Sequence, residues 1–139
     1  MEFRLEVIDD WPPVSAESLW VEPIGDGKFR IDNSPFFVRN IAVGDLVEGA
    51  EVLDEPVKFV GKISSGGHST VWVITLNDKI GESLKGGIRE LGCHVEGSPW
   101  PSLISIDVPS GSHLGELHRL LREVASTGQI EFVDACVVE

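Results

Sequence analysis

The fold of the C-terminal half is decided by the stretch TVWVITL at residues 70–76. Its side chains are apolar at consecutive positions instead of alternate ones, which is typical of a central strand covered on both faces. Asn77 or Asp78 follows at once and is suited to cap a helix. Apolar residues then recur at helical spacing up to residue 91, and Gly92 is placed to end the helix. The stretch therefore predicts a central strand followed by a helix.

The segments that follow extend this pattern into a complete sheet. Strands are expected around residues 93–97, 103–108 and 130–138. Residues 110–112 lead into a second helix, which is predicted by the apolar stripe Leu114, Leu117, Leu121 and Val124 and ends near Gly128. The order strand, helix, strand, strand, helix, strand is the ferredoxin-like split βαβ arrangement. Right-handed crossovers then place the last strand next to the first, followed by the third and the second.

The N-terminal half has a different pattern, in which short strands are separated by turns. Residues 19–24 and 28–32 flank a Gly-Asp-Gly turn, which is a strong hairpin signal. Further turns predict a small antiparallel β-barrel-like half over residues 1–64. With the ferredoxin-like half over residues 65–139, the expected class is α+β, and the lack of a flexible linker favours one compact unit. Trp20 and Trp72 are expected in the two cores.

The composition excludes several classes of function. The 139 residues include 23 acidic and 11 basic ones, a net charge of −12 with neutral histidines, which argues against binding nucleic acid or an anionic membrane. No apolar run approaches the ~18 residues of a membrane span, and the N-terminus lacks the pattern of a signal peptide. We expect a cytoplasmic protein without a cofactor, in which Cys93 and Cys136 are buried free thiols on opposite edges of one sheet.

A glycine-rich turn between the halves is the first candidate site. It consists of Gly66, Gly67, His68, Ser69 and Thr70. Its amides and hydroxyls are suited to bind an anion or a small molecule, although it lacks the spacing of a P-loop and precedes a strand. His68 and its neighbour Ser69 should point to opposite faces, so a direct pair of nucleophile and base is not expected. The alternatives are a structural turn, or an enzyme in which a distant carboxylate orients His68 as a general base.

Acidic residues form the second candidate site. Glu48, Glu51, Asp54 and Glu55 lie close together with no base among them. They are expected to form a negative patch facing a basic partner, or else a solvated face. Trp100, held in a loop between prolines, is a candidate contact with that partner or a lid over the core. The spacing of His and Cys matches no metal site, so no metal ligand and no catalytic residue is assigned.

A family resemblance rests on motifs spread over the chain. They are Leu19-Trp20, Gly27, Phe29, Asn33-x-Pro35-Phe36, Gly44-Asp45-x-Val47, Gly67-His68-Ser69-Thr70, Leu91-Gly92 and Asp107-Val108-Pro109. In these motifs the sequence resembles a bacterial family catalogued as domain of unknown function 4265. The family has no assigned activity, so the resemblance implies a small bacterial protein and identifies no catalytic residue.

Together these features predict a non-enzymatic binding or inhibitor protein. Small acidic bacterial proteins include many immunity proteins, which neutralise a toxin domain, and an acidic surface speeds association with a basic toxin. The first alternative is a regulatory module that binds a small molecule or anion at residues 66–70. The second is an uncharacterised enzyme that uses His68 as a general base.

Overall fold

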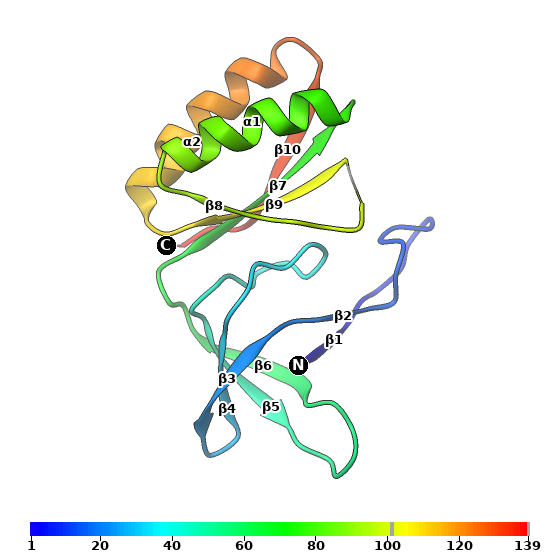
Figure 1. Cartoon of the computed structure of the whole chain (residues 1–139). Coiled ribbons are helices and arrows are strands. Elements are labelled where there is room, and N and C mark those ends of the chain that lie inside the picture. Colours follow the sequence, from blue (N-terminus) through cyan, green and yellow to red (C-terminus); the bar gives the residue numbers. More distant parts are fainter. Residues whose placement is uncertain (101, 139) are drawn as a thin grey trace.

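The computed structural model describes residues 1–100 and 102–138, and its strands form two sheets, one in each half of the chain (Figure 1). The strands of the N-terminal half are β1 (Glu2–Arg4), β2 (Ala16–Ser18), β3 (Val21–Gly25), β4 (Lys28–Ile31), β5 (Leu46–Ala50) and β6 (Lys58–Ser64). They form one curled sheet in the order β2-β1-β6-β5-β4-β3. The expected hairpin around Asp26 is present, with φ of 56° at that residue.

The N-terminal sheet differs from the expected antiparallel barrel in two respects. It is an open half-barrel, and β1 lies parallel to β6. The sheet also contains a second hairpin, which the two prolines at residues 12 and 13 concealed. Asp9 and Asp10 adopt left-handed conformations at its tip, with φ of 53° and 64°, and Ile8 pairs with Trp11. The chain therefore returns as β2 alongside β1 instead of leaving the sheet.

The core of this half follows the period-two pattern of its strands. Phe29 and Ile31 of β4 point inward, whereas their neighbours are exposed. Leu19 is also buried, but Trp20 is 78% exposed, so its expected place in the core was wrong. Successive residues of an extended chain point to opposite faces, and it is Leu19 that takes the inward position.

The C-terminal half forms the second sheet together with both helices. Its elements are β7 (Ser69–Thr75), α1 (Asp78–Glu90), β8 (His94–Glu96), β9 (Leu103–Val108), α2 (Gly111–Ala125) and β10 (Ile130–Cys136). The sheet order is β10-β7-β9-β8, which is the predicted order, and every pair is antiparallel. Both helices cover one face of the sheet (Figure 1). Asn77 caps α1, as its Oδ1 accepts a hydrogen bond of 3.0 Å from the amide of Ile80.

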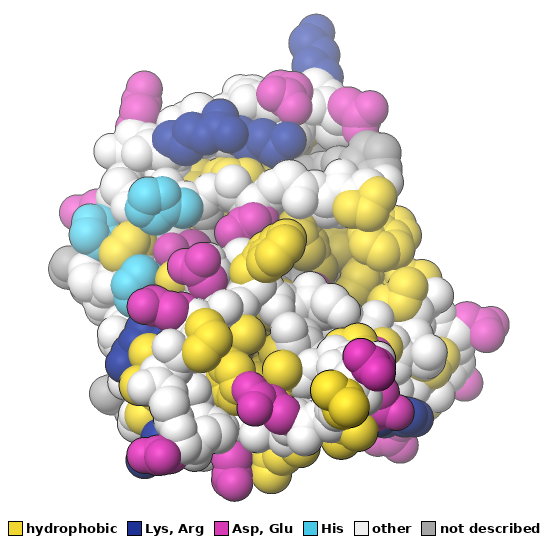
Figure 2. Space-filling view, turned by 60° about the horizontal axis from the view of Figure 1, so that its bottom comes forward, with side chains coloured by type: hydrophobic (Ala, Val, Ile, Leu, Met, Phe, Trp, Pro, Cys, Tyr) yellow, Lys and Arg dark blue, Asp and Glu magenta, His cyan; other side chains and the backbone are white. Residues whose placement is uncertain are grey.

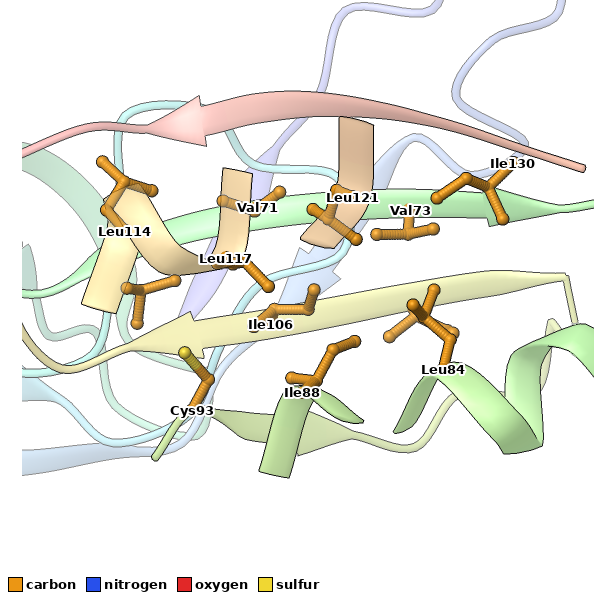
Figure 3. Close-up of a cluster of buried hydrophobic side chains, with 12 residues drawn as sticks. Val71, Val73, Leu84, Ile88, Cys93, Ile106, Leu114, Leu117, Leu121 and Ile130 are labelled. Carbon is orange, nitrogen blue, oxygen red and sulfur yellow. The ribbon is translucent and has the colours of Figure 1, made fainter. Parts of the chain in front are cut away.

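The core of this half lies between the sheet and the helices (Figure 3). Val71 and Val73 of β7 meet Leu117 and Leu121 of α2, and all four side chains are fully buried. Cys93 is buried at the β8 edge of the sheet, while Cys136 is buried on the opposite edge strand, and both are free thiols. Neither helix is long and apolar enough to cross a bilayer, as judged over the described residues.

The other face of the C-terminal sheet packs against residues 33–42 of the N-terminal half. The indole Nε1 of Trp72 donates a hydrogen bond of 2.8 Å to the carbonyl of Pro35, and the hydroxyl of Thr70 donates one of 2.9 Å to the carbonyl of Ile41. Phe37 packs beside Trp72 in a small core of its own. Trp72 is thus buried as predicted, and it joins the two halves.

Candidate functional site

The glycine-rich turn lies where the two halves meet, and its donors are largely occupied. The amide of Gly66 donates to the carboxylate Oδ1 of Asp45 at 3.0 Å, and the amide of Gly67 donates to the hydroxyl of Ser65 at 3.1 Å. A side chain at Gly66 would collide with the backbone of Gly44. The glycine therefore permits two loops to touch, which is a structural reason for its presence.

The remaining hydroxyls of the turn are buried. The Ser69 hydroxyl accepts a hydrogen bond of 3.0 Å from the amide of Val138, and the Thr70 hydroxyl is bonded to Ile41. Both side chains are fully buried. These contacts argue against the predicted anion site, because the donors that it requires already serve the fold.

His68 is the member of the turn that keeps an accessible polar group. Its Nδ1 lies 2.7 Å from Oδ1 of Asp107, and the two side chains are 28% and 9% exposed. An ionised carboxylate only accepts, so Nδ1 donates this hydrogen bond, and in the neutral imidazole Nε2 carries the lone pair. His94 stands opposite Asp107 in the register of β8 and β9. The structure therefore supplies the distant carboxylate that a general base at His68 requires.

Asp45 is the polar centre of the junction, a position that its sequence neighbourhood did not predict. It is fully buried, and its Oδ2 accepts bonds from the amide of Ala42 at 2.9 Å and from Nζ of Lys62 at 3.0 Å. With Gly66 on the other oxygen, the carboxylate is paired on both sides. The Gly44-Asp45 turn was visible in the sequence, but its partners lie in another loop and strand. We assign Asp45 a structural role.

The predicted acidic patch is built around a tight turn between β5 and β6, residues 51–55, which we call the 51–55 turn. The carbonyl of Val52 accepts a hydrogen bond of 3.0 Å from the amide of Glu55, and Asp54 is left-handed with φ of 62°. Leu53 occupies the apex and is 90% exposed, next to Val52 at 52%. The turn thus displays two apolar side chains among carboxylates.

The four predicted acidic residues are all exposed, and two of them have basic neighbours. Lys58 approaches Glu55 at 3.5 Å, and both side chains are well exposed, so this pair contributes little to stability. Glu48 stands opposite Lys28 in the register of β4 and β5. On the face that Figure 2 shows, carboxylates are interspersed with hydrophobic side chains over the N-terminal half. The patch is therefore acidic on balance and partly apolar.

Trp100 does not join this patch. It is half-buried, and its ring packs edge-on against Phe37 at 5.1 Å between ring centroids, in the manner of a lid over the core. In Figure 1 its loop belongs to the upper half, whereas the β5–β6 turn lies at the bottom. Trp11, which also lies beside prolines in a loop, contacts the same Phe37 at 5.8 Å between ring centroids and stays 54% exposed.

The described residues contain no group of three or more His, Cys, Asp or Glu side chains placed to hold a metal ion. Burial raises the pKa of Cys93 to about 11, with smaller contributions from the negative charges of Asp107 and Glu116. Burial also raises the pKa of Cys136, against the opposing charge of Lys62. Neither thiol therefore has the low pKa of a reactive cysteine.

These features define a small α+β protein in which a curled sheet packs against a helix-covered sheet. The family model described as Domain of unknown function (DUF4265) matches residues 17–132, and the chain belongs to this family. It shares its fold with a solved structure described as "Novel crystal structure of a hypothetical protein from Neisseria gonorrhoeae", at a TM-score of 0.82 and 19% identity. That match covers 99% of this chain and 95% of the other. No curated protein matches.

Proposed function

We propose that this protein is a non-enzymatic binding protein that holds a basic protein partner at the 51–55 turn. The observation that carries the proposal is Leu53, a large apolar side chain that is 90% exposed at the apex of a hydrogen-bonded turn. Water contact with such a side chain is unfavourable, and a fixed turn loses little entropy on binding. A catalytic domain of a toxin is the kind of partner that we favour, with this chain as its immunity protein.

The surrounding charge supports a basic partner. Glu51, Asp54 and Glu55 flank the apolar apex, and the whole chain carries a net charge of −12. Complementary charge speeds association and excludes acidic partners, while a central apolar anchor supplies most of the affinity. An apolar apex inside an acidic rim fits this division of roles.

The test begins with the capture of partners from the lysate of the native host. The bait is the full chain, either wild type or Leu53→Ala, and retained proteins are identified by mass spectrometry. We expect a stoichiometric basic protein with the wild type, and at least tenfold weaker binding with Leu53→Ala once the partner is purified. The immunity form of the proposal requires that the chain also inhibits the activity of the purified partner.

Leu76→Ala is the matched control, because Leu76 is 74% exposed on the other half of the molecule. It should bind the partner as the wild type does. Equal affinities of the wild type and Leu53→Ala, or the absence of any stoichiometric partner, would contradict the proposal.

A second candidate function follows from the His68–Asp107 pair. A histidine held by a carboxylate at 2.7 Å through Nδ1 is suited to act as a general base through its other nitrogen. A screen for hydrolysis of esters and phosphoesters tests it, with His68→Gln as the comparison. Activity that is lost in His68→Gln would establish an enzyme, and no activity in the wild type would leave His68 as a structural residue.

Two finer assignments belong to the same proposal. We assign the C-terminal half to the ferredoxin-like class, because its strand order and its two helices on one face follow that arrangement. We place the protein in the cytoplasm, since Cys93 and Cys136 are both free, as thiols are in a reducing compartment.

A further inference from the structure

A pocket of about 190 Å³ lies between the two halves, on the sheet face away from the helices. Trp11 and Phe36 of the N-terminal half and Trp72 of β7 provide aromatic walls, while Ile74, Leu103 and Val133 add aliphatic ones. Figure 2 shows hydrophobic side chains gathered in the recess between the two halves. The 51–55 turn contributes no residue to this pocket, so the site is separate from the proposed partner surface.

Two opposite charges stand at this pocket without an ion-pair partner among the described residues. Arg39 and Glu131 both line it, and within residues 1–100 and 102–138 neither makes an ion pair or a hydrogen bond through its side chain. The guanidinium carbon of Arg39 lies 5.3 Å from the ring centroid of Trp72. The next residue, Asn40, anchors this segment to the edge of β10 through a hydrogen bond of 2.8 Å to the carbonyl of Ala135.

The sheet register explains why Glu131 faces the same space. Glu131 pairs with Ile74, and Val133 pairs with Trp72 across β10 and β7. Paired residues of neighbouring strands point to one face, so these four side chains share the face that forms the pocket. Arg39 and Glu131 do not pair with each other, which leaves both charges available to a ligand.

We propose that this pocket binds a free aromatic α-amino acid. The aromatic ring would occupy the apolar interior, the carboxylate would pair with Arg39, and the ammonium group would pair with Glu131. A cavity of about 150 Å³ holds benzene, and pockets for drug-sized ligands start near 300 Å³. The pocket therefore has room for one aromatic ring, and a nucleotide would extend well beyond it. A zwitterion matches a site with one unpaired charge of each sign, whereas a simple acid or amine would leave one of them unpaired.

Isothermal titration of the full chain with four probes tests this assignment. They are L-phenylalanine, 3-phenylpropionate (no ammonium group), phenethylamine (no carboxylate) and L-leucine (no ring). We expect saturable binding of L-phenylalanine, and about tenfold weaker binding of each of the two analogues that lack one charge, because a charge-assisted hydrogen bond is lost. L-Leucine should bind more weakly than L-phenylalanine because the aromatic walls lose their ring contacts.

Variants then assign each charge. Arg39→Gln should weaken the binding of L-phenylalanine about tenfold and leave the affinity for phenethylamine unchanged. Glu131→Gln should weaken the binding of L-phenylalanine and leave the affinity for 3-phenylpropionate unchanged. Both side chains are exposed, so folding should be unaffected. Arg119→Gln on α2 and Glu90→Gln on α1 are matched controls, since both residues are exposed on the helices.

Three results would overturn the proposal. The first is the absence of binding of L-phenylalanine to the wild type at millimolar concentration. The second is equal affinity of phenethylamine and L-phenylalanine, and the third is unchanged affinity in Arg39→Gln and Glu131→Gln. If the wild type binds no amino acid and Trp11→Ala no longer binds the protein partner, the pocket is part of the surface that binds that partner.

Discussion

Glu17 illustrates how much of this fold depends on single carboxylates. Its two oxygens accept hydrogen bonds from the amides of Phe36, Phe37 and Val38 at 2.7, 3.0 and 3.0 Å. These amides belong to the segment that packs between the two sheets. Hydrogen bonds to a charged group are worth more than neutral ones, so one side chain on β2 orders the junction.

Glu17→Ala should therefore lower the free energy of unfolding by about 2–4 kcal/mol, because three amides lose their acceptor. Glu17→Gln keeps one carbonyl oxygen and should cost less. Urea denaturation measures both, with Glu22→Ala as the control, since Glu22 is exposed on β3 and should change stability by about 0.5 kcal/mol or less. A Glu17→Ala variant as stable as the control would show that the three bonds are not needed.

Cys93 predicts a dependence of stability on alkaline pH. Its pKa is raised from 9.0 to about 11 in the folded protein, chiefly by burial. The folded state therefore keeps a proton that the unfolded state releases in this range. The stabilisation is complete below pH 9 and is lost as the pH rises towards 11.

Urea denaturation of the wild type and of Cys93→Ala at about pH 8 and about pH 11 isolates this contribution. The wild type should lose more stability than Cys93→Ala between the two conditions, since all other titrating groups are shared. Equal losses in both proteins would contradict the raised pKa.

At the residue scale, the sequence predicted what depends on local pattern and missed what depends on distant partners. The free, buried state of the two cysteines and the burial of Trp72 were confirmed. The predicted burial of Trp20 was wrong, because a shift of one residue in register moves a side chain to the other face of the sheet. The partner of His68 lies 39 residues away, and no spacing rule reveals it.

Among the secondary-structure elements, the contact of two loops depends on Gly66. A side chain there would meet the backbone of Gly44, so Gly66→Ala should lower the free energy of unfolding by about 1–3 kcal/mol through steric strain. A Cβ added at Gly115, on the exposed face of α2, meets nothing within 4 Å. Gly115→Ala should therefore raise the free energy of unfolding by about 0.5–1 kcal/mol through helix propensity. Thermal melts of both variants check the opposite signs, and a neutral Gly66→Ala would refute the close contact.

The elements themselves were predictable to different degrees. The order of the C-terminal sheet followed from apolar periodicity and the handedness of crossovers, and it was confirmed. In the N-terminal half, β2 and the parallel pairing of β1 with β6 were missed. Three-residue strands carry too little periodicity to be recognised, and pairing between distant segments has no local signal.

For the whole molecule, the net charge and the exposed apolar side chain at the 51–55 turn contribute to partner binding in different ways. The net charge of −12 belongs to the entire surface, whereas Leu53, which at 90% is the most exposed large hydrophobic side chain of the described residues, lies at one point of that surface, the 51–55 turn. Long-range charge governs how fast a partner arrives, and the apolar contact governs how long it stays. The composition predicted the first property, but only the structure reveals Leu53 as the candidate for the second.

The proposed function is tested most directly by the association rate constant of the chain with its purified partner, measured at low and high salt. The variant carries Glu51→Gln, Asp54→Asn and Glu55→Gln, and a control carries Glu90→Gln, Glu116→Gln and Glu123→Gln on the helices. We predict that the wild type and the control associate fast at low salt and slow down with added salt, and that the turn variant associates more slowly with a weaker salt dependence. Identical rate constants for the turn variant and the control would contradict the assignment of the 51–55 turn as the binding surface.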